Sequence, residues 1–158
     1  MTSLKWLFPI LLVAGITAAS RVNAAGPDSA GRSGSPAQAL AMLERAVAAV
    51  RADKSKALEM FNNGTNGFRD RDLQPFCFER VSGKVVATLQ PAILGVDARS
   101  LVDQSGKRFG AELIAAAAVG QRATVTYLFA RPGEKKPALK TSYVTAVLDL
   151  GCGVGFYP

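Results

Sequence analysis

The chain has 158 residues, and its 19 lysines and arginines outnumber its 12 acidic residues, giving a formal net charge of +7. The basic excess is spread along the chain rather than gathered into one stripe, which argues against a nucleic-acid-binding protein. The chain has no histidine and only two cysteines, so no metal site is expected, and nothing in the composition indicates a cofactor.

The first 24 residues have the three parts of a cleavable signal peptide. Residues 1–5 form a short basic segment, residues 6–19 are apolar, and Val22-Asn23-Ala24 places small residues where a signal peptidase reads. An uncleaved membrane anchor is the alternative, but the apolar run is shorter than the roughly 20 residues that span a bilayer. We therefore expect cleavage after Ala24 and a periplasmic or secreted protein, with residues 25–34 as a flexible leader and 35–158 as one domain.

Two helices are predicted at the start of this domain. Ser35-Pro36-Ala37-Gln38 has the pattern of a capping box, and apolar residues then recur at helical spacing between Leu40 and Val50. Asp53 is suited to cap a second, shorter helix, which Asn62-Asn63-Gly64 would end.

From Leu73 onward the apolar residues no longer recur at helical spacing, and strands are expected. Ser82-Gly83 indicates a hairpin between the first two strands, and Gly106 precedes one further helix. The predicted strands are residues 73–81, 84–89, 122–131, 140–150 and 152–157, and the predicted helix runs from 107 to about 119. This order predicts an α+β fold with an antiparallel sheet and helices on one face.

The two cysteines, Cys77 and Cys152, both lie in the part of the chain that would be exported. An even pair in an oxidising compartment favours a disulfide, and it would close a loop of about 75 residues. Two buried free thiols are the alternative, since cysteine also packs as a small apolar residue.

Several stretches of the chain resemble one known family when they are taken together. Residues 101–107 (LVDQSGK) follow a Leu-x-Asp-x-x-Gly-Lys pattern, in which Asp103 is expected to cap a turn rather than to contact a ligand. The other matching stretches are residues 38–64, 72–78, 90–95, 127–129, 140–144 and 152–157. In this order they resemble the single Cache domains of the second subtype, which are extracytoplasmic sensor modules.

The resemblance implies a PAS-like Cache fold, with an antiparallel sheet of about five strands and a long N-terminal helix. It also implies that the first and last strands are neighbours, which favours the pairing of Cys77 with Cys152. Relatives that bind small organic acids or similar metabolites do so in a pocket on the sheet face. One departure is that the family commonly has His-Pro after the second strand, where this chain has Thr88-Leu89. The resemblance therefore leaves open a different ligand, weaker binding or none.

The candidate ligand-binding residues are Tyr127, Phe129, Lys140, Tyr143, Thr88 and Arg122. Tyr127 and Phe129 share a strand face and are candidates for an aromatic wall, with simple core packing as the alternative. Lys140 offers a cation to a carboxylate, unless it is a solvated charge at a strand end. Tyr143 is three residues further on, so a regular strand points it to the opposite face. Arg122 begins its strand and is equally suited to solvent.

The expected function is that of a free-standing ligand-binding or sensing domain without its own output domain, which would signal through a separate membrane receptor or periplasmic complex. The alternative is a structural or accessory subunit of a periplasmic complex that binds no ligand. The long N-terminal helix is suited to homodimerisation in either case. An enzyme is not expected, because the chain lacks a histidine for acid–base catalysis and its twelve acidic residues are scattered.

Overall fold

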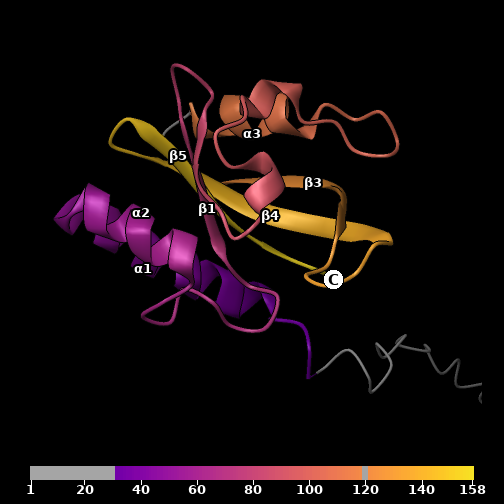
Figure 1. Ribbon diagram of the computed structural model, residues 1–158, viewed down its shortest axis with the longest axis horizontal. Coiled ribbons are helices and arrows are strands. Elements are labelled where there is room, and N and C mark those ends of the chain that lie inside the picture. Colours follow the sequence, from indigo (N-terminus) through magenta and orange to yellow (C-terminus); the bar gives the residue numbers. More distant parts are fainter. Residues whose placement is uncertain (1–30, 119–120) are drawn as a thin grey trace, which may run out of the picture.

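The structure, a computed structural model, describes residues 31–118 and 121–158 (Figure 1). The predicted signal peptide and its cleavage site after Ala24 lie outside the described residues. Within the described part, no helix is both long and apolar enough to cross a membrane.

Two capped helices open the fold, as the sequence predicts. Helix α1 (Pro36–Ala52) begins with a complete capping box, in which Ser35 Oγ accepts from the Gln38 backbone N–H and the Gln38 side chain accepts from the Ser35 N–H. Asp53 caps the N-terminus of helix α2 (Lys54–Asn63), and its carboxylate accepts from the Lys56 N–H. The helix ends at Gly64, which has a left-handed φ of 64°.

Five antiparallel strands form one sheet, in the order β2-β1-β5-β4-β3. The strands are β1 (Pro75–Glu79), β2 (Val85–Ala87), β3 (Ala123–Ala130), β4 (Pro137–Val147) and β5 (Leu150–Phe156). The first and last strands are neighbours, and Cys77 lies directly opposite Cys152 in their register. These two fully buried cysteines form a disulfide, so the predicted pairing is confirmed.

The predicted boundary between the last two strands is wrong. Residues 140–150 were expected to be one strand, but Val147 pairs with Leu150, so Leu148 and Asp149 form a two-residue hairpin loop. Leu148 has a positive φ of 54° and no glycine marks the turn. Contacts from distant segments hold this loop, because Asp149 pairs with Lys54 at 2.6 Å and its carbonyl accepts from the Arg80 N–H.

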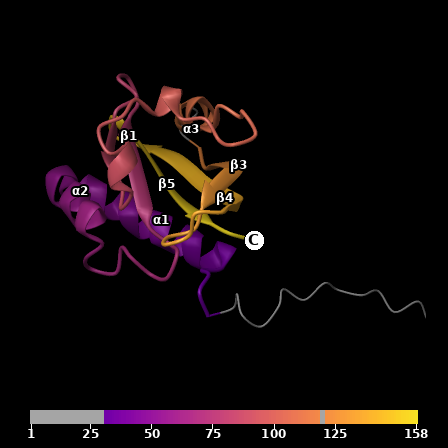
Figure 2. The ribbon, with the colours of Figure 1, turned by 45° about the vertical axis from the view of Figure 1, so that its right-hand side comes forward.

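Helices cover both faces of the sheet, which corrects the expectation of helices on one face only. Helices α1 and α2 pack on one face, and α3 (Phe109–Ala117) packs on the other together with two short 3-10 turns, η1 (Pro91–Ile93) and η2 (Ala98–Ser100) (Figures 1 and 2). All seven residues of β5 are buried. A central strand buried on both sides requires cover on both sides.

Three alternating glycines make one face of β5 flat. Gly151, Gly153 and Gly155 all point to the α3 face, since side chains alternate along a strand. A Cβ at Gly151 or Gly153 would collide with the ring of Phe78 or Phe76, respectively, and one at Gly155 would collide with Cε of Lys140. The missing side chains therefore let two aromatic rings and a lysine lie across the middle of the sheet.

Packing of the N-terminal segment begins before Ser35, inside the stretch expected to be a flexible leader. Gly34 is buried against the Leu73 side chain, and its backbone N–H donates to Asp72 at 2.7 Å. The Arg71 guanidinium donates to the Ser33 carbonyl at 3.0 Å. The composition of the leader gave no sign of this packing, because Asp72 and Leu73 belong to a segment almost forty residues away.

Candidate functional site

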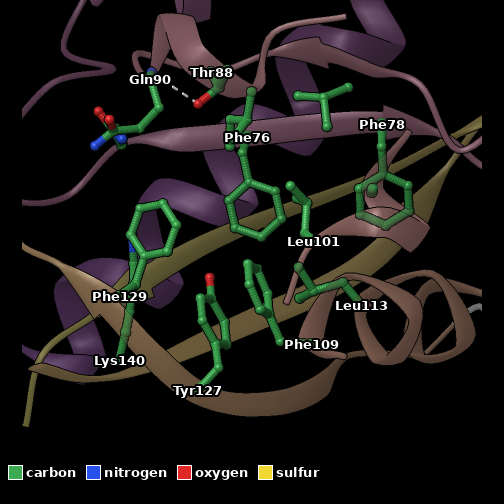
Figure 3. A pocket seen from close by; sticks show the side chains of 14 residues that line it. Phe76, Phe78, Thr88, Gln90, Leu101, Phe109, Leu113, Tyr127, Phe129 and Lys140 are labelled. Atoms are coloured by element: carbon green, nitrogen blue, oxygen red, sulfur yellow. Dashed lines mark hydrogen bonds between the residues drawn. The ribbon is translucent and has the colours of Figure 1, made fainter. Parts of the chain in front are cut away.

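A cavity, called here the central cavity, lies between the α3 face of the sheet and the connector that follows β2. Fourteen residues line it, and its free volume is about 40 Å³ (Figure 3). That space holds about three water molecules, since each needs about 10–15 Å³ on this measure. The cavity is thus suited to a very small ligand.

Five of the fourteen residues that line the cavity are aromatic. The ring of Phe109, at the start of α3, stacks on Tyr127 of β3 with centroids 4.2 Å apart and an interplanar angle of 6°. Phe129 meets both rings edge-on at 6.1 and 6.0 Å. Phe76 and Phe78 complete the lining from β1, lying over the flat face of β5. A molecule bound in the cavity would therefore have much of its surface in contact with apolar rings.

Among residues 31–118 and 121–158, Lys140 is the one charged residue that lines the central cavity. Only 5% of its surface is exposed, and its ammonium lies 5.1 Å from the Phe129 ring centroid and 5.2 Å from that of Tyr157. It makes no hydrogen bond or ion pair with any residue in 31–118 or 121–158. Burial lowers the pKa of Lys140 to about 8, against the opposing effect of the negative charge of Asp72. The expectation of a solvated strand-end charge does not apply to this lysine.

Tyr127 lies beside Lys140, because the two are directly paired across β3 and β4. Its hydroxyl shares a 2.9 Å hydrogen bond with the buried hydroxyl of Ser142. Burial raises the pKa of Tyr127 to about 12, while the Ser142 hydrogen bond acts in the opposite sense. Tyr127 therefore stays a neutral hydroxyl at physiological pH, and the pair supplies uncharged polar groups next to the ammonium.

Thr88 reaches the cavity through an irregularity in β2. Cys77 pairs with Ala87 but Phe78 pairs with Val85, which leaves Val86 as an extra residue in the strand. Asn62, in the last turn of α2, holds this bulge: its amide donates to the Val86 carbonyl at 3.1 Å and accepts from the Thr88 N–H at 2.9 Å.

The Thr88 hydroxyl accepts from the Gln90 N–H at 3.0 Å, so its own hydrogen is left to donate (Figure 3). Figure 3 shows Thr88 and Gln90 on the side of the cavity opposite Tyr127 and Lys140.

Four of the six sequence-predicted site residues line the central cavity, and two do not. Tyr127, Phe129, Lys140 and Thr88 line it. Tyr143 points to the other face of β4, where its ring packs against Phe156 with centroids 5.4 Å apart.

Arg122 lies on the same face of the sheet as Tyr143. Its guanidinium is 6.0 Å from the Tyr143 ring and 3.8 Å from the Glu44 carboxylate. The alternation along a regular strand is the reason, since Lys140 and Tyr143 are an odd number of residues apart.

Sequence reasoning missed the glycines of β5, Asn62 and the two glutamines of the cavity lining. The alternation Gly151-Cys152-Gly153-Val154-Gly155 was the available signal, because glycine at every second strand position indicates close approach by other groups. Asn62 gave no such signal, because an asparagine at the end of a helix is accounted for by the helix end alone. Its function depends on the position of β2, which is 24 residues further along the chain.

The prediction that Asp103 caps a turn is confirmed. Its Oδ1 accepts from the backbone N–H groups of Ser105 and Lys107, and its Oδ2 accepts from that of Leu128 in β3 at 2.9 Å. These hydrogen bonds, the one from Leu128 above all, lower the pKa of Asp103 to about 2. Asp103 thus fastens the connector to the strand that carries Tyr127.

The chemistry of the central cavity suits a small anion with an apolar part. In the described part of the chain, it combines the ammonium of Lys140 and the hydroxyl groups of Thr88 and Tyr127 with an apolar wall. In the described part of the chain, no group of three His, Cys, Asp or Glu residues lies close enough to hold a metal ion.

Comparisons with known proteins agree with this geometry. Residues 76–157 match the family Single Cache domain 2. A methyl-accepting chemotaxis protein from Vibrio parahaemolyticus RIMD 2210633 has a similar structure, with a TM-score of 0.62, 20% sequence identity, and coverage of 77% of this chain and 86% of that chain. No curated protein matches the sequence.

Two further solved structures share the fold at similarly low identity. One is a periplasmic sensor domain of a chemotaxis protein, with a TM-score of 0.58, 21% identity, and coverage of 75% of this chain and 87% of that chain. The other is a Cache chemosensory domain described for its recognition of carboxylic acid, with a TM-score of 0.58, 20% identity, and coverage of 75% and 85%. The predicted α+β fold and the resemblance of the sequence are thereby confirmed.

Proposed function

The chain belongs to the Single Cache domain 2 family, and from that premise we propose that it is an extracytoplasmic sensor domain that binds a small organic acid in the central cavity. The observation that supports this most is Lys140, a buried residue that lines the central cavity and whose ammonium has no hydrogen-bonding partner in the described residues. A carboxylate would accept charge-assisted hydrogen bonds from this ammonium. The hydroxyl groups of Tyr127 and Thr88 are donors available to the same anion.

Electrostatics favour an anion over a neutral ligand. An ammonium taken out of water is costly unless a counter-charge meets it, and the pKa of Lys140, lowered to about 8, reflects that cost. A bound carboxylate would offset it and raise the pKa of Lys140 again. Asp72 does not serve as the partner, because its carboxylate is bonded to Arg131 at 3.1 Å and to the Gly34 N–H.

Size and wall chemistry narrow the ligand class. A free volume of about 40 Å³ suits an acid of two or three carbons, such as acetate or propionate, whose alkyl group would contact the aromatic wall. Thr88, where the family commonly has histidine, offers a hydroxyl instead of an ionisable ring. The positive charge that balances the anion therefore comes from Lys140. We propose binding without chemical change to the ligand, since none of the described residues that line the cavity has a carboxylate and Tyr127 stays protonated.

Isothermal titration with acetate, propionate and butyrate tests this proposal, with methylammonium and glycerol as charge controls. We expect saturable binding of at least one acid and a thermal stabilisation that grows with its concentration. Lys140→Met should abolish binding, whereas Lys84→Met, which removes an exposed lysine directly before β2, should not change it. The proposal fails if no acid binds, or if the Lys140 variant binds as tightly as the wild type.

We also propose that the domain acts in the periplasm or outside the cell. The buried disulfide between Cys77 and Cys152 supports an oxidising compartment. Fractionation of cells that produce the full chain, followed by mass spectrometry of the N-terminus, tests this. The expected product begins at Ala25; a product that keeps residue 1 and stays in the cytoplasm would contradict the proposal.

A further inference from the structure

A second hollow adjoins the central cavity and shares two of its lining residues. This hollow, called here the arginine groove, has a free volume of about 210 Å³ and is lined by Arg69, Arg71, Gln74, Leu89, Gln90 and the Pro132-Gly133 turn. Gln74 and Gln90 also line the central cavity. The two spaces are therefore neighbours separated by two glutamine side chains, and the groove is the larger of them.

The groove is framed by the ends of strands that also carry the cavity. Gln74 directly precedes β1, Gln90 lies three residues after β2, and Pro132-Gly133 is in the turn from β3 to β4. Figure 3 shows Gln90 next to Thr88, at the side of the cavity opposite Tyr127. A molecule that extends from Lys140 past the two glutamines would enter the groove.

The two arginines of the groove differ in their pairing. Arg71 donates to both oxygens of Asp70, at 3.0 and 2.9 Å, and also to the Ser33 carbonyl, so its charge is matched and its position is held. Arg69 is exposed and makes no hydrogen bond or ion pair with any residue in the described ranges. Its guanidinium is therefore available to an acceptor, and a guanidinium matches a carboxylate or phosphate with paired N–H donors.

We propose that the natural ligand carries a second anionic group, which Arg69 binds in the arginine groove while the first lies at Lys140. This inference rests on the proposed binding of an acid at Lys140 and adds the class of ligand: short compounds with an acidic group at each end. The glutamine amides between the two sites would hydrogen-bond the polar atoms of the spacer or of the second acid. A monocarboxylate would occupy the central cavity alone.

Titration calorimetry with acids of matched length tests the inference. Butyrate is compared with succinate, valerate with glutarate, and 3-phosphonopropionate with succinate to separate phosphonate from carboxylate. We expect one diacid to bind at least tenfold more tightly than the monoacid of its length. Arg69→Gln should remove most of that advantage and change monoacid affinity less than about twofold. Arg51→Gln removes an exposed arginine from α1, on the opposite face of the sheet, and should leave both affinities unchanged.

The possible results separate this inference from the proposed function. Monoacids that bind through Lys140 while no diacid or phosphonate binds more tightly would overturn the inference and leave the proposed function standing. Equal losses in the Arg69 and Arg51 variants would also overturn it, because the effect would then be one of overall charge. If no acid of any kind binds, both fail together. A phosphonate that binds best through Arg69 would support the inference and identify the second group.

Discussion

Replacing Lys140 by methionine removes a buried ammonium and keeps a long, unbranched side chain in the same space. Burial lowers the pKa of Lys140 from 10.5 to about 8, and each pKa unit corresponds to about 1.4 kcal/mol. The charged form therefore costs the empty, folded protein about 3 kcal/mol relative to the neutral amine. We expect Lys140→Met to raise the free energy of unfolding by about that amount at pH 7, and the melting temperature by roughly 10 °C.

The stability difference between the wild type and Lys140→Met should depend on pH. Because the pKa of Lys140 is lower in the folded state, the unfolded chain holds one more proton between about pH 8 and pH 10.5. The free energy of unfolding of the wild type should thus rise across that range relative to the variant. The advantage of the variant is complete below about pH 8 and is lost as the pH approaches 10.5.

Urea unfolding of the wild type, Lys140→Met and Lys84→Met at pH 7, 9 and 10.5 measures both effects. The difference between wild type and the Lys140 variant cancels the titration of other groups, and the exposed Lys84 controls for loss of one positive charge. A variant no more stable than the wild type at pH 7 would show that the ammonium finds adequate solvation in the cavity. An acid ligand at about 1,000 times its Kd should reverse the order, since only the wild type binds it and would gain about 4 kcal/mol.

Three other changes probe the scaffold of the site. Changing both Cys77 and Cys152 to alanine should lower the free energy of unfolding by about 4 kcal/mol in urea, because the disulfide closes a loop of 75 residues; an unchanged midpoint would contradict this. Gly155→Ala places a Cβ against Cε of Lys140, so we expect calorimetry to show at least a tenfold weaker affinity for acids, and undiminished binding would refute it. The pKa of Asp103, about 2 when folded against 3.8 unfolded, means that its stabilisation is present above pH 4 and is lost as the pH falls towards 2. Asp103→Asn should accordingly unfold more easily than the wild type at pH 7 and equally easily at pH 2 in circular dichroism.

Features that depend on neighbours in the chain were readable from the sequence. The capping box at Ser35 and the cap at Asp53 join groups that are three residues apart, so their hydrogen bonds can be predicted from the local sequence. The shared face of Tyr127 and Phe129 follows from the period of a strand, as does the separation of Lys140 from Tyr143. The Asp103 turn likewise depends on hydrogen bonds to residues two and four positions ahead.

Features that depend on contacts between distant segments appeared only in the tertiary structure. The turn at Leu148 is held by residues from α2 and from the loop after β1, and the bulge that turns Thr88 into the cavity is held by Asn62. The cover of α3 on the second face of the sheet was unexpected for the same reason.

Lys140 shows the difference most clearly. Its place on a strand and its charge were evident from the sequence, and these made it a candidate cation for a carboxylate. Its burial, its flanking rings and its lowered pKa arise from β3, β5 and the C-terminal Tyr157 together. The sequence determines which side chains are available and how they alternate, whereas solvation and charge pairing depend on groups that only the folded chain brings within a few ångströms.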